Sequence, residues 1–180
     1  MNKPPEHYDS GAMLLHWSVA VLILCASLSS FLLNRAFSDS TTILIRTIHN
    51  VTGTLAFGLV IVGVGWRALH AELPKLATLG SGEHRFMDIT NGTLNVLLLL
   101  VPVTGILHLF ALGKSIDLGV FQLSYGVSMS QQNLKLLGLT HNVLGKLVLA
   151  IALLHSVHAL WHHFGKRDDL VRRMLPWASK

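Results

Sequence analysis

The chain has 180 residues, of which 51% are hydrophobic and only 13% are charged, about half the charged fraction of an average soluble domain. This composition excludes an ordinary soluble protein and indicates a membrane protein. The formal net charge of +5 does not indicate nucleic acid as a partner. The basic residues lie mostly in the segments that flank the apolar runs, where Lys and Arg set the orientation of a membrane protein. The single cysteine, Cys25, excludes an intrachain disulfide and any Cys-x-x-Cys metal or haem-attachment motif.

Four apolar runs are long enough to cross a bilayer, which takes about 20 residues. They cover residues 12–33, 47–69, 86–112 and 137–163. Short connections leave no room for a second domain, so we predict an all-α fold, one four-helix transmembrane bundle formed by residues 1–180. The polar start of the chain shows no signal-peptide cleavage pattern, and the first run is expected to remain as a span. The longest connection, residues 113–136, has room for a short surface helix.

The basic residues predict the orientation of the bundle. If the N-terminus is cytoplasmic, that side holds nine Lys and Arg residues and the other side holds four, with Lys146 left within a span. By the positive-inside rule, both termini are expected in the cytoplasm. The nine are Lys3, Arg67, Lys75, Arg85, Lys166, Arg167, Arg172, Arg173 and Lys180, and the four are Arg35, Arg46, Lys114 and Lys135.

A short motif, His-Asn-Val-x-Gly, occurs twice, from His49 to Gly53 and from His141 to Gly145. Each copy lies at the start of an apolar run, with the histidine one helical turn ahead of the glycine. A histidine in lipid is costly unless something uses it, and a glycine one turn away lets the edge of a flat ligand approach the backbone. The repeat therefore predicts a planar cofactor between two helices, with haem as the natural candidate.

Two more histidines, His16 and His155, lie within apolar runs. His141 and His155 share one helix face about 21 Å apart. Because successive spans alternate in direction, only the pairs His49/His141 and His16/His155 lie at matching depths, the first near the outer surface and the second near the inner one. Zinc sites need three or four protein ligands, whereas two axial imidazoles complete the coordination of haem iron. We predict two non-covalent haem b groups, with these four histidines as axial ligands and Gly53 and Gly145 beside the outer ring.

Other residues carry weaker expectations. Pro102 is predicted to bend the third span, and Gly58, Gly63 and Gly65 are predicted to lie at close helix contacts. His158, one turn beyond His155, is a candidate contact for a haem propionate or a quinone, with a helix-to-helix hydrogen bond as the alternative. His162 and His163 are predicted to be solvated at the inner interface, and the basic segment 166–180 to lie against anionic lipid.

Several of these features together resemble the bacterial cytochrome b561 family, and the resemblance covers nearly the whole chain. They are His16-Trp17, His49, Pro102-Val103-Thr104-Gly105, His141, His155, and the segment from His162-His163-Phe164 through Asp168 to Met174. The resemblance implies a four-helix protein of the bacterial inner membrane that binds two b haems and passes electrons between the quinone pool and a partner at the membrane surface. One member of that family looks like a superoxide oxidase that reduces ubiquinone. Family members often have histidines near the start of the third span, where this chain has Asp88 and Asn91, which leaves the substrate open.

We therefore expect a membrane dihaem cytochrome that transfers electrons between a periplasmic donor, with superoxide as a candidate, and a quinone such as ubiquinone. Membrane lipid, the quinone and a redox protein are the expected partners. Two alternatives remain. A haem-bearing membrane anchor of a separate dehydrogenase or hydrogenase would bind haem but have no activity alone. A histidine-lined metal or proton transporter, supported only by the His155-x-x-His158 spacing, would bind no haem.

Overall fold

A computed structural model of the protein describes residues 7–33, 35, 37–70, 76, 79–117 and 122–175. Four long helices make up most of it: α1 (Ser10–Leu32), α2 (Asp39–Leu69), α3 (Ser81–Ala111) and α4 (Gln131–Leu160). Each is long and apolar enough to cross a membrane, so the predicted all-α four-helix bundle is confirmed. α4 continues without a break into a π-helical segment, η1 (Trp161–Lys166), and a short 3₁₀ turn, η2 (Arg172–Met174), follows.

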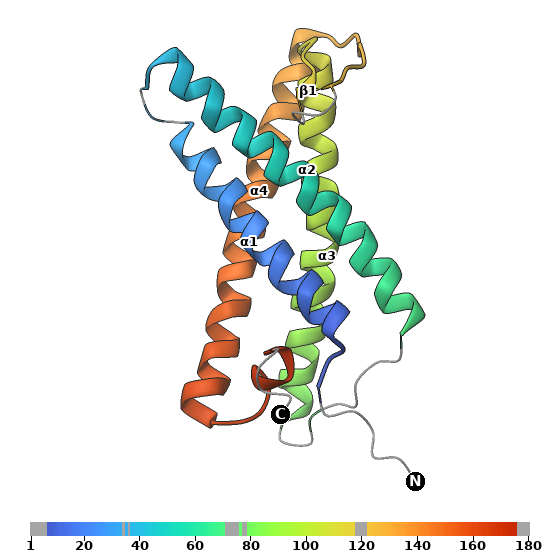
Figure 1. Cartoon of the computed structure of the whole chain (residues 1–180), viewed down its shortest axis with the longest axis vertical. Helices are drawn as coiled ribbons and strands as arrows, with labels where there is room; N and C mark the ends of the chain where they lie inside the picture. The colour runs from blue at the N-terminus through green and yellow to red at the C-terminus, as the bar shows by residue number, and fades with distance from the viewer. Residues whose placement is uncertain are drawn as a thin grey trace.

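The helices associate as two antiparallel pairs. α1 packs along α2 and α3 packs along α4, while α2 also touches α3, and Figure 1 shows the α1–α2 pair crossing the α3–α4 pair obliquely. The α1–α2 connection and the β1–β2 region lie at one end of the bundle, which we call the hairpin end. The described chain ends and the start of α3 lie at the other, which we call the terminal end.

Most of the outer surface is apolar. Large side chains such as Leu14, Leu24 and Leu153 are mostly exposed, although they belong to the most hydrophobic stretches of their helices. A continuous apolar surface of this extent is unfavourable in water and favourable in hydrocarbon. The exposed leucines are therefore the lipid-facing surface of the bundle.

Serine caps determine where two of the helices begin. The Ser38 hydroxyl accepts a hydrogen bond from the Thr41 N–H at 3.4 Å, and the Ser130 hydroxyl accepts one from the Asn133 N–H at 3.3 Å. Such caps satisfy backbone donors that have no partner within the helix. Consequently α2 and α4 start several residues before the apolar runs predicted at 47 and 137, because a polar cap and not the first apolar residue fixes the helix start.

The connection between α3 and α4 differs from the prediction of a surface helix. Its described part contains two short antiparallel strands, β1 (Ile116–Asp117) and β2 (Gln122–Leu123). Gly113 ends α3 with a φ of +68°, a conformation that glycine adopts without steric cost. The chain therefore turns back on itself as a hairpin before α4 begins.

The close helix contacts are not where the sequence placed them. A Cβ added to Gly58, Gly63 or Gly65 would meet no atom within 4 Å, so the prediction that these glycines allow close packing is wrong. A Cβ would instead clash at three other positions, each with an aromatic ring from a neighbouring helix: Gly11 with Trp66, Gly105 with His141 and Gly138 with His108, at 2.4, 2.7 and 2.8 Å respectively. The small residues of this bundle accommodate rings, and two of the three rings are imidazoles.

Candidate functional site

His49 of α2 and His141 of α4 face each other near the hairpin end. Their ring centroids are 6.1 Å apart and their planes are almost perpendicular, at 86°. Each ring is held through Nδ1 by a backbone carbonyl of a third or fourth helix: His49 donates to Ala26 of α1 at 2.9 Å, and His141 donates to Val101 of α3 at 3.0 Å. All four helices thus contribute to positioning this pair.

These hydrogen bonds fix the tautomer of both imidazoles. A carbonyl oxygen can only accept a hydrogen bond, so Nδ1 must carry the proton in each ring. The lone pair of Nε2 is then free to bind a metal. A metal-binding histidine usually donates its other N–H to a carbonyl or carboxylate, and both rings have this arrangement.

His16 of α1 and His155 of α4 form the second pair, toward the terminal end. Their ring centroids are 6.4 Å apart with an interplanar angle of 58°. The edge of Trp17 packs against His16 at 5.4 Å. Within the described ranges, neither ring has a hydrogen-bond partner, which distinguishes this pair from the pair at the hairpin end.

The spacing of both pairs fits two imidazoles on one iron. A metal–nitrogen bond of about 2.0 Å on each side and a ring radius of about 1.1 Å place two such centroids about 6.2 Å apart. The observed distances of 6.1 and 6.4 Å bracket this value. The donor sets contain two histidines each, and a search of the described residues finds no group of three or more His, Cys, Asp or Glu side chains that could hold a metal ion.

The structure brings the four predicted histidines together in the predicted pairs, while their role as haem ligands stays a prediction. Gly53 and Gly145 both border open space, because a Cβ at either position would meet no atom within 4 Å. The same holds for Gly58, so open space alone does not single out Gly53 and Gly145 as haem neighbours.

Gly105 and Thr104 are site residues that the sequence analysis did not identify as such. The His141 ring lies against the backbone at Gly105, and the Thr104 hydroxyl is 3.3 Å from His141 Nδ1. The Pro102-Val103-Thr104-Gly105 segment was interpreted only as a bend and as part of the family resemblance. The sequence does indicate this contact, since Gly105 lies one turn beyond Pro102, and a small residue near a bend in a helix makes room for a side chain of another helix.

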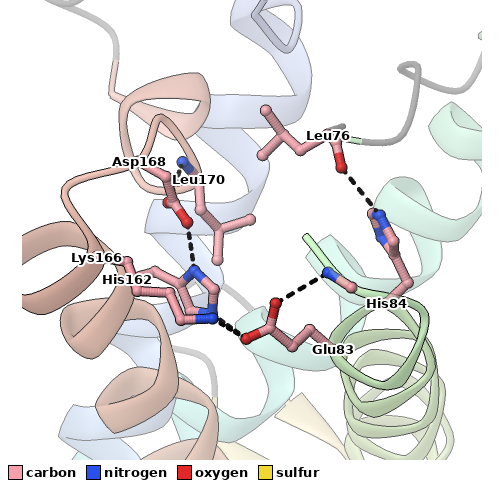
Figure 2. A network of polar contacts seen from close by, with 8 residues as sticks. Leu76, Glu83, His84, His162, Lys166, Asp168 and Leu170 are labelled. Carbon is pink, nitrogen blue, oxygen red and sulfur yellow. Dashed lines mark hydrogen bonds and ion pairs between the residues drawn. The ribbon is translucent and has the colours of Figure 1, made fainter. Parts of the chain in front are cut away.

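A third group of polar residues lies at the terminal end, and Figure 2 shows it in detail. His162 is completely buried, contrary to the prediction that it is solvated. Its Nδ1 is 2.5 Å from Asp168, and its Nε2 is 3.6 Å from Glu83 of α3, which also pairs with Lys166. His162 follows His155 by seven residues, close to two helical turns, so the helix carries it toward the face of the paired histidines.

Comparisons with known proteins agree with this architecture. The family model described as prokaryotic cytochrome b561 matches residues 7–177. A protein of Escherichia coli (strain K12) named cytochrome b561 homolog 2 is 24% identical over 177 residues, which cover 97% of this chain and 94% of that relative. The family match spans nearly the whole chain and includes all four paired histidines. The chain therefore belongs to the prokaryotic cytochrome b561 family, which places it among the membrane b-type cytochromes that bind haem and take part in electron transfer.

Proposed function

We propose that the protein binds two haem b groups, one between His49 and His141 and one between His16 and His155, and carries electrons between a donor at the hairpin end and the membrane quinone pool. The observation that carries this proposal is the presence of two facing histidine pairs, with centroid distances of 6.1 and 6.4 Å, at two levels of one bundle. When bound, the haems supply one-electron chemistry, and the protein supplies position and environment.

The residues around the ligands would tune the two sites differently. Donation of Nδ1–H to Ala26 and Val101 makes the imidazoles of His49 and His141 more basic. More basic axial ligands favour ferric iron and lower the reduction potential. His16 and His155 have no such partner among the described residues, so we expect the haem at the terminal end to have the higher potential and electrons to flow toward it.

The distribution of charge supports an electron donor on the periplasmic side, at the hairpin end. The excess of Lys and Arg at the terminal end supports a cytoplasmic position for that end by the positive-inside rule. Arg46 and Lys135, both exposed, then lie on the periplasmic side near the hairpin-end pair and would attract a small anion such as superoxide. We take superoxide as the first donor to test and ubiquinone as the first acceptor.

The haem proposal is tested by a reduced-minus-oxidised visible spectrum of the purified protein together with a pyridine haemochrome count. We expect two b haems per chain. His49→Ala and His141→Ala should each remove the hairpin-end haem, while His16→Ala and His155→Ala should each remove the other. His163→Ala is the matched control, since this histidine belongs to neither pair, and it should keep both haems. Wild-type protein without haem would overturn the proposal.

The donor and acceptor are tested separately on protein that carries both haems. Purified protein in detergent is mixed with a superoxide source and a soluble ubiquinone analogue, and ubiquinol formation is followed with superoxide dismutase as the control. Formation of ubiquinol that superoxide dismutase abolishes supports a self-sufficient redox enzyme. Fully haem-loaded protein that forms no ubiquinol overturns superoxide as the donor and favours a membrane anchor that works with a separate redox protein.

A further inference from the structure

The group around His162 contains a histidine between two carboxylates that differ in their access to water. His162 itself has no exposed surface. Asp168, which faces its Nδ1, has an 8% exposed side chain, whereas Glu83, which faces its Nε2, is 29% exposed. Figure 2 shows the imidazole lying between these two carboxylates, which come from different parts of the chain.

Each carboxylate is held in place by its own contacts. Asp168 uses its second oxygen to accept a hydrogen bond from the Leu170 N–H at 3.1 Å. Glu83 accepts one from the Gly80 N–H at 3.0 Å and is paired with Lys166. Both carboxylates are therefore held by contacts in addition to those with the His162 ring.

The two nitrogens of His162 are not equivalent. Nδ1 makes a 2.5 Å contact with Asp168, but Nε2 is buried and has no hydrogen-bond partner among the described residues. Its nearest acid oxygen, on Glu83, is 3.6 Å away, beyond a normal hydrogen bond. A purely structural clamp would satisfy both nitrogens, since an unpaired buried polar atom is costly. A base oriented by one carboxylate, with a water-accessible carboxylate close to its other nitrogen, is instead an arrangement suited to proton transfer.

This group lies near the histidine pair at the terminal end. The His162 ring is 4.6 Å from that of His158, and His158 follows His155 by one turn. Seven residues separate His155 from His162, a rise of about 10 Å. At this distance in a weakly polarisable interior, a unit change of charge at the haem site alters the energy of a proton on His162.

We propose that His162 is a proton-binding site coupled to the oxidation state of the haem held by His16 and His155, and that Glu83 exchanges this proton with water. The inference rests on the proposed function. A haem held by His16 and His155 would supply the one-electron change, and His162 would gain one proton with it. An N–H bond forms at Nε2 as the O–H bond of Glu83 breaks, and Glu83 takes its proton from water through its exposed side. Within the part of the chain that the structure describes, the charged or titratable groups facing His162 are Asp168, Glu83, Lys166 and His158.

The test is a redox titration of the haem-loaded protein at several values between about pH 5 and pH 8, where histidine changes its charge. In the wild type, the potential of the terminal-end haem should fall as the pH rises, because reduction is accompanied by proton uptake. His162→Gln should remove this pH dependence. His163→Gln, which alters the neighbouring histidine, should keep it. A potential that does not depend on pH in the wild type, or an equal dependence in His162→Gln, overturns the proposal.

The role of Glu83 is tested by kinetics. After rapid reduction in weakly buffered solution with a pH indicator, Glu83→Gln should slow proton uptake at least tenfold, because the path from water to Nε2 is interrupted. Asp169→Asn is the matched control: it removes an exposed carboxylate at the same end of the protein that pairs with Arg172, and it should leave the rate unchanged. An unchanged rate in Glu83→Gln overturns the role of Glu83.

The two proposals fail in different ways. Protein without haem overturns the proposed function and, with it, the coupling of His162. Protein with two haems but no pH-dependent potential overturns only the coupling. Should His162→Gln fail to fold, Glu83→Gln alone decides the matter, since Glu83 is partly exposed and its amide variant keeps a similar shape.

Discussion

Single hydrogen bonds decide which nitrogen atoms of this protein can bind metal. His49 and His141 each present Nε2 because a carbonyl on another helix takes the proton of Nδ1. Gly105 has no side chain, which lets the His141 ring lie against α3 and reach the Val101 carbonyl. The geometry of the pair at the hairpin end is therefore determined as much by the backbone of α1 and α3 as by the histidines themselves.

Gly105→Ala tests this dependence. The added Cβ would lie 2.7 Å from the His141 ring, so the ring must move, at a cost of about 1–3 kcal/mol for overpacking. We expect the hairpin-end haem to be lost or its spectrum altered, while the terminal-end haem remains. Gly92→Ala in the same helix is the control, because its Cβ would meet no atom. Two unaltered haem spectra in Gly105→Ala would contradict this account of how His141 is positioned.

Asp9 joins the start of α1 to the end of α2. Its carboxylate accepts hydrogen bonds from the Ala12 N–H at 3.0 Å and the Trp66 indole at 3.1 Å. The bond from Ala12, followed by the bond from Trp66, keeps the pKa of Asp9 below its ordinary value. Because the folded state binds the proton more weakly than the unfolded state, the stabilisation is complete at neutral pH and is lost as the pH falls through this lowered pKa.

Two variants separate the cap from the charge. Asp9→Ala should destabilise the protein by about 1 kcal/mol at neutral pH, because the cap is lost. Asp9→Asn keeps an oxygen acceptor, so its unfolding temperature at neutral pH should lie only slightly below that of the wild type. This small difference between Asp9→Asn and the wild type should disappear as the pH falls below about 4, where the Asp9 carboxylate becomes protonated. Thermal unfolding in detergent, followed by circular dichroism, measures both effects. Equal stability of Asp9→Ala and wild type would show that the cap contributes nothing measurable.

At the scale of the element, α4 is the helix that serves both histidine pairs. It carries His141 and His155 on one face, as the 3.6-residue period predicts from their separation of 14 residues in the sequence. The same period also places His162, seven residues after His155, toward this face, and its side chain is buried although the helix widens to π geometry from Trp161. Sequence periodicity could therefore predict the paired histidines and the face of His162, whereas the enclosure of His162 by Asp168 and Glu83 depends on contacts from other segments that no residue pattern reveals.

One inserted residue in α4 tests how far the helix register determines the site. An alanine inserted after Ala150 turns His155 by about 100° relative to His141. His141 is anchored by Val101 and Gly105, so the terminal-end haem should be lost and the hairpin-end haem kept. An alanine inserted after Ser128, in the exposed connection before α4, should leave both haems. If the variant with an alanine after Ala150 binds two haems, the helix absorbs the extra residue as a bulge, and the register of α4 does not determine the site.

For the whole molecule, the apolar runs predicted the helices because about 20 apolar residues suffice to specify a membrane span. The relation between depth and alternating helix direction predicted which histidines meet. The terminal end depends on contacts that the sequence does not reveal: the Tyr8 N–H donates to the Arg173 carbonyl at 3.1 Å, and the Trp17 indole donates to the Met174 carbonyl at 2.8 Å. Backbone acceptors such as these are the same for every residue type, so no sequence pattern identifies them.

The orientation of the whole bundle is predicted from charge alone and can be measured directly. Cys25→Ser provides a background without cysteine, and one cysteine is then placed at either end, at Ser128 in the exposed connection before α4 or at exposed Asp169 near the described C-terminal end. With nine basic residues expected on the terminal side and four on the other, the positive-inside rule places the terminal end in the cytoplasm. A membrane-impermeant maleimide should label Ser128→Cys in intact spheroplasts, and Asp169→Cys only after lysis. The reverse pattern would put the hairpin end in the cytoplasm and, with it, the proposed donor site on the wrong side of the membrane for periplasmic superoxide.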